Sequence, residues 1–132
     1  MKIKFLLSLG ILALAFAGLS CTDDNGVVYN NLNDPFSSIY EPQAPSSLTA
    51  TVMADSGIML SWKSNSLKED GFRIFSRKGI IGDLVKIAQV PAKTTTYFDR
   101  FQVHSGVTYY YQVASFNKNI RGNYSKEIHV QW

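Results

Sequence analysis

The sequence predicts an all-β fold, a seven-stranded antiparallel β-sandwich that occupies residues 44–132. Two observations lead to this prediction. From Ala44 onward, short runs of alternating apolar and polar residues recur about every ten positions, separated by turn residues, which is typical of antiparallel sandwiches. No segment in this part of the chain has a convincing helical stripe of apolar residues.

The first three expected strands alternate most clearly. Each places every second side chain on one face, and these side chains are Leu48, Ala50 and Val52 in residues 46–54, Ile58, Leu60 and Trp62 in residues 57–63, and Phe72, Ile74 and Ser76 in residues 71–78. Two weaker strands are expected at 83–90 and 94–99, and stretches 107–117 and 125–132 complete the seven. Because successive strand residues point to opposite faces, one face of each strand is expected to meet the core.

Aromatic residues are expected to fill the space between the two sheets. The chain has a single cysteine and therefore no internal disulfide, so apolar bulk must hold the sheets together. Trp62 lies in the middle of its alternating run and can bury on the order of 200 Å². Tyr109, Tyr111 and Val113 share the alternation expected to face inward. We predict these four residues as core.

In this order and spacing, the segments "APSSLTA", "LSW", "EDGFRIFSRK", "TTTYFD" and "GVTYYYQVASFN" resemble a fibronectin type III domain over nearly all of residues 44–132. The resemblance implies an immunoglobulin-like sandwich in which Tyr109 forms a tyrosine corner, a buried phenol bonded to backbone a few residues upstream. The leucine and proline that the family places six and four residues before this tyrosine are Val103 and Ser105 here, whereas Gly106 is retained.

A candidate binding patch follows from the same alternation. If the apolar residues of 71–78 face the core, Arg73, Phe75 and Arg77 point outward, and Tyr110 is outward on the strand that the resemblance places beside them. We predict an exposed aromatic patch of Phe75 and Tyr110, flanked by both arginines and suited to a glycan ring or a protein partner. The alternative is an ordinary cross-strand aromatic pair that stabilises the sheet.

Two loops remain open to more than one interpretation. Residues 78–83 place Ile80 and Ile81 near a hairpin tip, with Gly82 and Asp83 as the expected turn; the isoleucines either anchor a partner or are partly buried by a longer hairpin. Residues 117–125 are expected to form the loop between the last two strands, which many fibronectin type III domains use for recognition. No Arg-Gly-Asp tripeptide occurs, because Asn123 follows the Arg-Gly pair.

The sequence has no arrangement typical of an enzyme or a metal site. The two histidines, His104 and His129, fall in different elements, and neither has a catalytic partner nearby in sequence. There is no nucleophile elbow, glycine-rich phosphate loop or acidic cluster with metal-ligand spacing. Glu69 and Asp70 are assigned to a turn. We therefore predict no catalysis, no cofactor and no metal.

Residues 1–20 have the layout of a secretory signal peptide. Lys2 and Lys4 precede an uncharged stretch, 5–19, of about fifteen residues, which is shorter than the roughly 20 that a membrane-spanning helix needs. A retained signal-anchor helix is the alternative. The following "AGLSC" resembles the lipobox of bacterial lipoproteins, although Gly18 replaces the usual leucine. This resemblance implies that Cys21 carries lipid, palmitate included, as the first mature residue and attaches the protein to a membrane.

The segment after Cys21 is expected to be an acidic, flexible linker over residues 21–43. It carries four acidic and no basic residues, whereas residues 44–132 carry eleven basic and six acidic ones. The excess is too small and too dispersed to predict a nucleic-acid partner. The "TDD" directly after Cys21 resembles the export signal of surface lipoproteins in Bacteroidetes-type bacteria, which implies outer-membrane attachment facing the cell surface; the alternative faces the periplasm.

These features predict an outer-membrane lipoprotein that presents a non-catalytic binding or adhesion module. Its expected partners are an envelope protein or a polysaccharide. The alternative is a structural accessory subunit of an envelope assembly.

Overall fold

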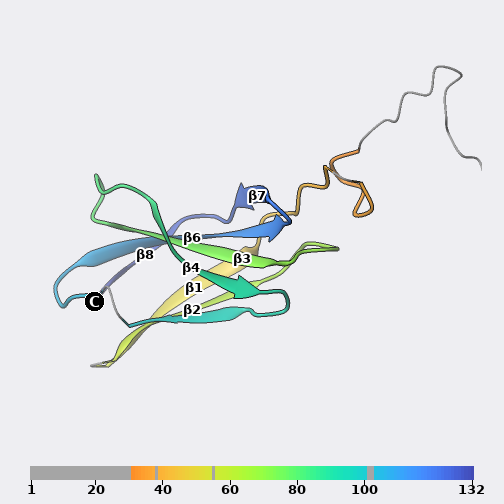
Figure 1. Ribbon diagram of the computed structural model, residues 1–132. Helices are drawn as coiled ribbons and strands as arrows, with labels where there is room; N and C mark the ends of the chain where they lie inside the picture. The colour runs from red at the N-terminus through yellow and green to blue at the C-terminus, as the bar shows by residue number, and fades with distance from the viewer. Residues whose placement is uncertain (1–30, 38, 55, 101–102) are drawn as a thin grey trace, which may run out of the picture.

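The computed structural model describes residues 31–37, 39–54, 56–100 and 103–132, which form two antiparallel sheets packed face to face (Figure 1). The three-stranded sheet has the order β1-β2-β5, and the five-stranded sheet has the order β4-β3-β6-β7, with β8 also paired to β6. The strands are β1 (Ser46–Met53), β2 (Gly57–Lys63), β3 (Gly71–Lys78), β4 (Val85–Pro91), β5 (Thr96–Asp99), β6 (Thr108–Asn117), β7 (Ile120–Tyr124) and β8 (Ile128–Gln131). The predicted all-β sandwich is confirmed.

Several predictions concern residues outside this description. The signal peptide of residues 1–20, the lipidation site Cys21 and the acidic pair Asp23 and Asp24 all lie there. Within the described residues, no helix has the length and apolar character needed to cross a membrane.

The segment assigned to the loop before the last strand contains β7, so the described residues form eight strands instead of seven. The predicted last strand, 125–132, contains β8. The C-terminal half of β6 pairs with β7 and its N-terminal half pairs with β8, so both short strands lie along the same edge of β6. Between them, Ser125 donates its backbone N–H to the Val113 carbonyl at 2.8 Å, and its hydroxyl accepts the Val113 N–H at 3.0 Å. The side chain of Ser125 thus bridges the break in the ladder.

The assignment of residues 117–125 to a loop is therefore wrong. Asn117 pairs with Ile120, which leaves Lys118 and Asn119 as a two-residue hairpin turn, with Lys118 at a φ of 52°. The strand after this turn, IRGNY, contains glycine and two polar residues, so its alternation is weak in sequence. Pairing with the long β6 strand supplies the order that its own composition does not predict.

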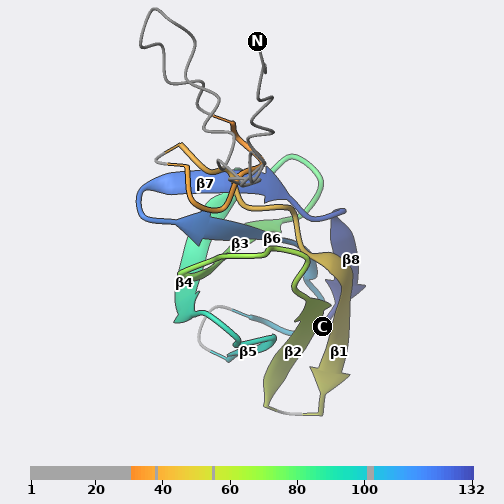
Figure 2. The same cartoon turned by 90° about the vertical axis from the view of Figure 1, so that its right-hand side faces the viewer.

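The core lies between the sheets and includes all four residues assigned to it from sequence. Trp62 is 4% exposed and packs edge-on against Phe72, with 5.5 Å between ring centroids. Tyr109, Tyr111 and Val113 come from β6 in the opposite sheet and are buried. Figure 2 shows the two layers from the end of the sandwich. The remaining buried members of this cluster are Leu48, Ile58, Leu60, Phe72 and Ile74.

Tyr109 holds the turn before β6, where the chain enters the five-stranded sheet. Its hydroxyl accepts a hydrogen bond from the backbone N–H of His104 at 2.8 Å, five residues upstream, which is the geometry of a tyrosine corner. Gly106, within this turn, has a φ of 80°, a left-handed conformation that favours glycine. His104 itself is exposed.

The last residues of the predicted linker pack on the domain. Tyr40 is 2% exposed; its hydroxyl accepts the N–H of Leu67 at 3.3 Å and lies 3.2 Å from the Ser66 hydroxyl. The Pro42 backbone lies so close to Gly122 of β7 that a side chain at position 122 would not fit. The packed structure therefore begins at Tyr40, before the boundary expected at residue 44.

The hairpin between β3 and β4 projects from the end of the sandwich opposite the segment 31–43 (Figure 1). Ile80 is 76% exposed and Ile81 is 95% exposed, so neither is buried by the hairpin. The turn involves residues 79–81, not Gly82 and Asp83 as expected. Gly79 has a φ of 63°, and Arg77 donates to the carbonyl oxygens of Gly79 and Ile80, which holds the turn at this earlier position.

Candidate functional site

The candidate site is the outer face of the five-stranded sheet, the side turned away from the core. On β3, Arg73, Phe75 and Arg77 point to this face because they alternate with core residues. The register of β3 with β6 places Arg77 opposite Tyr110, whereas Phe75 lies opposite Gln112. Phe75 and Tyr110 are therefore diagonal neighbours and not a direct cross-strand pair.

The prediction that Phe75 is exposed is wrong. Its side chain is 9% exposed, and its ring packs edge-on against Tyr124 of β7 with 5.0 Å between centroids. Tyr124 covers Phe75 because β7 extends the sheet where a loop was expected. Ala114 of β6, on the same face, is fully buried; it pairs with Arg73 on β3 and with Tyr124 on β7.

One part of the outer face is a neutralised arginine cluster, the Arg77 group, which consists of Arg77, Tyr110, Glu127 and His129. The Arg77 guanidinium lies 4.0 Å from the centroid of the Tyr110 ring and donates to both carboxylate oxygens of Glu127, at 2.8 and 3.1 Å. The rings of Tyr110 and His129 are 5.4 Å apart. The hydrogen bond from Arg77 lowers the pKa of Glu127 and raises that of Arg77, so both remain charged and their charges cancel.

A second part, the paired-arginine group, consists of Arg73, Phe116, Arg121 and Tyr124. Arg73 stacks 4.6 Å from the Phe116 ring centroid, and Arg121 stacks 4.1 Å from that of Tyr124. Phe116 pairs in register with Arg121, so the two stacks are adjacent. Among the described residues, no carboxylate forms an ion pair with either arginine, in contrast to Arg77.

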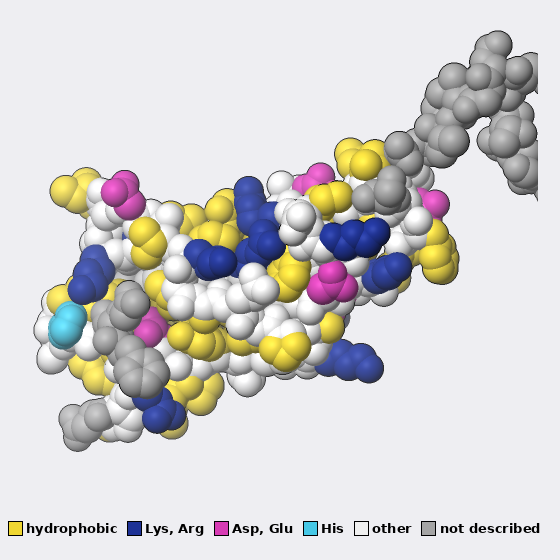
Figure 3. Space-filling model, viewed as in Figure 1, with side chains coloured by type: hydrophobic (Ala, Val, Ile, Leu, Met, Phe, Trp, Pro, Cys, Tyr) yellow, Lys and Arg dark blue, Asp and Glu magenta, His cyan; other side chains and the backbone are white. Residues whose placement is uncertain are grey.

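Figure 3 shows Lys and Arg side chains spread along the molecule with hydrophobic side chains between them. Arg73, Arg77 and Tyr110 were identified from sequence, but Arg121, Tyr124 and Glu127 were not. The alternation of β7 is weak in sequence, and a register shift between its pairings with Ala114 and Phe116 brings Arg121 and Tyr124 to the same face.

A small cavity opens at the end of the sandwich near the β3–β4 hairpin, with a volume of about 220 Å³. Its lining includes Ser76, Val85, Ile87, Asp99 and Tyr109. Asp99, 2% exposed, accepts a hydrogen bond from the Tyr111 hydroxyl at 2.9 Å. Burial raises the pKa of Tyr111, and the charge of Asp99 raises it further. Asp99 thus lies in the wall of the cavity, and its partner Tyr111 is fully buried.

In the part of the chain that the structure describes, no group of three or more His, Cys, Asp and Glu residues is arranged to hold a metal ion. His104 lies in the turn before β6 and His129 on β8, and both are exposed. Asp70, assigned to a turn from sequence, accepts the backbone N–H of Lys118 at 2.6 Å and so joins two loops. Glu69 accepts a hydrogen bond from Ser64 at 3.1 Å.

No protein-family model matches the chain, and no curated protein matches it in sequence. Solved structures do match. An Fn3-like protein from Clostridium thermocellum superposes with a TM-score of 0.59 at 23% identity, covering 68% of this chain and 92% of that one. The FN5 domain of Drosophila Lar gives a TM-score of 0.55 at 25% identity, covering 67% and 94%.

The chicken CNTN1 FN1–FN3 structure matches with a TM-score of 0.60 and 20% identity, and the match covers 67% of this chain but 31% of that longer one. The similarity to all three is thus to one module of this type. At these identities it concerns the arrangement of strands and carries no ligand with it.

Proposed function

We propose that this chain, whose domain is a fibronectin type III-like sandwich, is an outer-membrane lipoprotein that displays the domain at the cell surface as a non-catalytic binding module. The proposed partners are a protein of the same envelope or a polysaccharide. The binding surface is the outer face of the five-stranded sheet. The observation that supports this surface is the pair Arg73 and Arg121, each held against an aromatic ring there, because such groups are positioned in advance and keep charged donors for a partner.

Support for the membrane anchor comes from sequence alone. The single cysteine of the chain ends the segment "AGLSC", which comes after Lys2, Lys4 and the apolar stretch, and an acidic pair follows it after one threonine. Two or more acyl chains on Cys21 would attach the protein stably, since each buried methylene contributes about 0.8 kcal/mol. The position of the first packed residue, Tyr40, leaves residues 22–39 between anchor and domain.

Cys21→Ser is expected to abolish membrane attachment. Without the thiol no acyl chains can be added, so the variant should move from the membrane fraction to the soluble fraction and lose the lipid mass seen by mass spectrometry of the intact protein. A variant that stays in the membrane fraction with the same mass shift as the parent would show that the lipid assignment is wrong. Protease treatment of intact cells separates the two orientations, because only a surface-facing domain is digested before the outer membrane is opened.

The exposed hairpin tip favours the alternative function, a structural accessory subunit. Ile80 and Ile81 project at the end of the domain away from the segment 31–43 and provide an apolar contact for a larger assembly. Such a contact would not involve the outer sheet face.

Crosslinking on intact cells distinguishes the two functions. For a binding module, Arg73→Ala with Tyr110→Ala should remove the crosslinked partners, and Ile80→Asp with Ile81→Asp should leave them unchanged. The opposite result would support the accessory subunit. Both pairs are at least partly exposed in the structure, so each double variant is expected to change the free energy of unfolding little, which thermal melting can check.

A further inference from the structure

The paired-arginine group combines two positive charges with no acidic partner among the described residues. Arg73 donates its Nε–H to the Gln89 side chain at 3.3 Å, and Arg121 donates from Nη1 to the Gly122 carbonyl at 3.0 Å. A guanidinium has five N–H donors, so each arginine keeps several for a ligand. Exposed Lys86, opposite Phe75 on β4, adds a third cation to the same face.

Both arginines are positioned before any ligand arrives. Each lies over an aromatic ring, and the rings are themselves held: Phe116 is 8% exposed, and Tyr124 packs on the buried Phe75. A planar guanidinium fixed in this way loses less conformational entropy when it binds and presents its donor edge to solvent. Its geometry suits the two oxygens of a carboxylate, sulfate or phosphate.

Arg77 provides an internal comparison on the same face. It stacks on Tyr110 as closely as the other arginines stack on their rings. Unlike them, it donates hydrogen bonds to a carboxylate, that of Glu127. The chain itself thus supplies a carboxylate in one place, in the geometry that an external anion would adopt at Arg73 and Arg121.

The side chains exposed on the outer face favour a polysaccharide over a protein as the partner. A protein interface is usually built around an exposed apolar or aromatic centre. Here Phe75 and Phe116 are buried, and Phe116 lies beneath a guanidinium, so that centre is missing. Cations without an acidic partner among the described residues are instead spaced across an open sheet: Arg73 lies on β3 and Arg121 on β7, and these strands are two strand spacings apart, about 10 Å. The amides of Gln89, beside Arg73 on β4, and of Gln112, beside Phe75 on β6, can bond hydroxyl groups.

We propose that the outer face binds an acidic polysaccharide, with a carboxylate or sulfate group held between Arg73 and Arg121. This rests on the proposed function, because it specifies the ligand class for the same sheet face. The polymer lies across the strands, its anionic groups meet the guanidinium edges, and its hydroxyls meet the amides and the exposed edge of Tyr124.

The test measures binding of the full-length Cys21→Ser chain, which carries no acyl chains and needs no detergent, to four immobilised polymers and one vesicle. The polymers are polygalacturonate, dextran sulfate, neutral dextran and polyglutamate, and the vesicle contains phosphatidylglycerol. We expect binding to polygalacturonate or dextran sulfate, none to neutral dextran, and weaker binding to polyglutamate and vesicles. Arg73→Gln with Arg121→Gln should weaken acidic-polysaccharide binding about tenfold or more, since hydrogen bonds to charged groups are lost.

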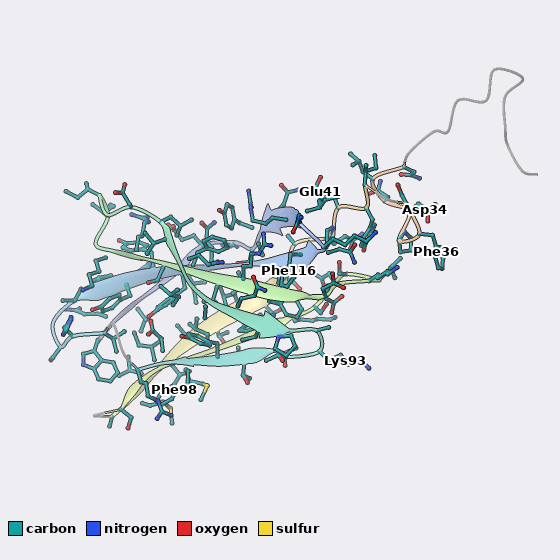
Figure 4. All side chains as sticks on the ribbon, in the orientation of Figure 1. Asp34, Phe36, Glu41, Lys93, Phe98 and Phe116 are labelled. Atoms are coloured by element: carbon teal, nitrogen blue, oxygen red, sulfur yellow. The ribbon has the colours of Figure 1, made fainter. Side chains whose placement is uncertain are left out.

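A matched control removes the same net charge from the other sheet. Arg100 stacks 4.9 Å from the Phe98 ring centroid, and Phe98 lies on β5, whereas Phe116 lies on β6 (Figure 4). Arg100→Gln with Lys63→Gln, both exposed, should change binding about threefold or less, the effect of net charge alone. Equal melting temperatures for both double variants would show that the loss comes from the site.

Three outcomes would overturn the proposal. These are equal losses in the two double variants, equal binding to neutral dextran, and preferential binding to polyglutamate or to vesicles. The crosslinking experiment separates this proposal from the proposed function. If crosslinked partners depend on the outer face while acidic polysaccharides do not, the ligand class is wrong and the binding module stands. If neither depends on that face, both fail.

Discussion

Replacing Trp62 by alanine is expected to lower the free energy of unfolding by about 3–5 kcal/mol. The indole is 4% exposed, lies between the two sheets and packs edge-on against Phe72, so its removal leaves a cavity that the facing strands cannot fill. Domains of this size have about 5–15 kcal/mol of stability in total. Urea unfolding followed by circular dichroism measures the loss, and Trp132 remains as a fluorescence reporter.

The matched control is Trp62→Phe. Within the described residues, the Trp62 Nε1–H is buried and has no hydrogen-bond partner, so phenylalanine removes an unsatisfied donor while it keeps an aromatic ring against Phe72. Its cost should be clearly smaller than that of alanine. If alanine cost less than about 1 kcal/mol, or if the two variants were equally unstable, the indole would not be the centre of the packing between the sheets.

The strands and the core were predictable because alternation is a local signal. Residues 57–63 and 71–78 carry large apolar side chains at alternate positions, and the strands found there have the expected limits. Trp62, Tyr109 and Tyr111 are large and aromatic, so inward placement is the arrangement that buries most apolar area. Such a pattern needs no knowledge of the neighbouring strand.

The details of the outer face were not predictable, because they depend on pairing across the sheet. Phe75 is buried by Tyr124, 49 positions along the chain, and Arg77 is neutralised by Glu127 at a similar separation. Because β7 was assigned to a loop, Tyr124 could not be placed, and the position of Glu127 beside Arg77 depends on how the chain enters β8. Strand order and register, which are not encoded in a single segment, decide which outward residues remain available to a ligand.

The start of the domain was missed for a related reason. Tyr40 and Pro42 follow a stretch rich in turn residues, and their alternation is too short to register as a strand. Their burial depends on Ser66 and Leu67, which lie in the loop between β2 and β3, and on Gly122 of β7. The apolar residues within the predicted linker, 21–43, were the sequence signal that part of it packs on the domain.

High pH is expected to destabilise the domain through Tyr111. Its hydroxyl donates to Asp99 and its side chain is fully buried; burial first, and then the charge of Asp99, raise its pKa above the value near 10 of an unfolded tyrosine. A phenol with a raised folded-state pKa contributes its stability below pH 10 and loses it as pH rises further, because only the unfolded chain then releases the proton. The free energy of unfolding should fall by about 1.4 kcal/mol per pH unit above pH 10 from this group. Urea midpoints measured from pH 8 to pH 12 give this slope.

The variant Tyr111→Phe tests whether this one phenol is responsible. At neutral pH it should be less stable by about 1–3 kcal/mol, because buried Asp99 loses a donor. Above pH 10 its stability should fall less steeply than that of the parent, although Tyr97, whose pKa is also raised by burial, keeps part of the slope. Tyr110→Phe removes a half-buried phenol from the outer face and serves as the matched control. Parallel alkaline slopes in parent and Tyr111→Phe would mean that the folded chain releases the Tyr111 proton as readily as the unfolded chain does. The Tyr111–Asp99 pair would then be open to water.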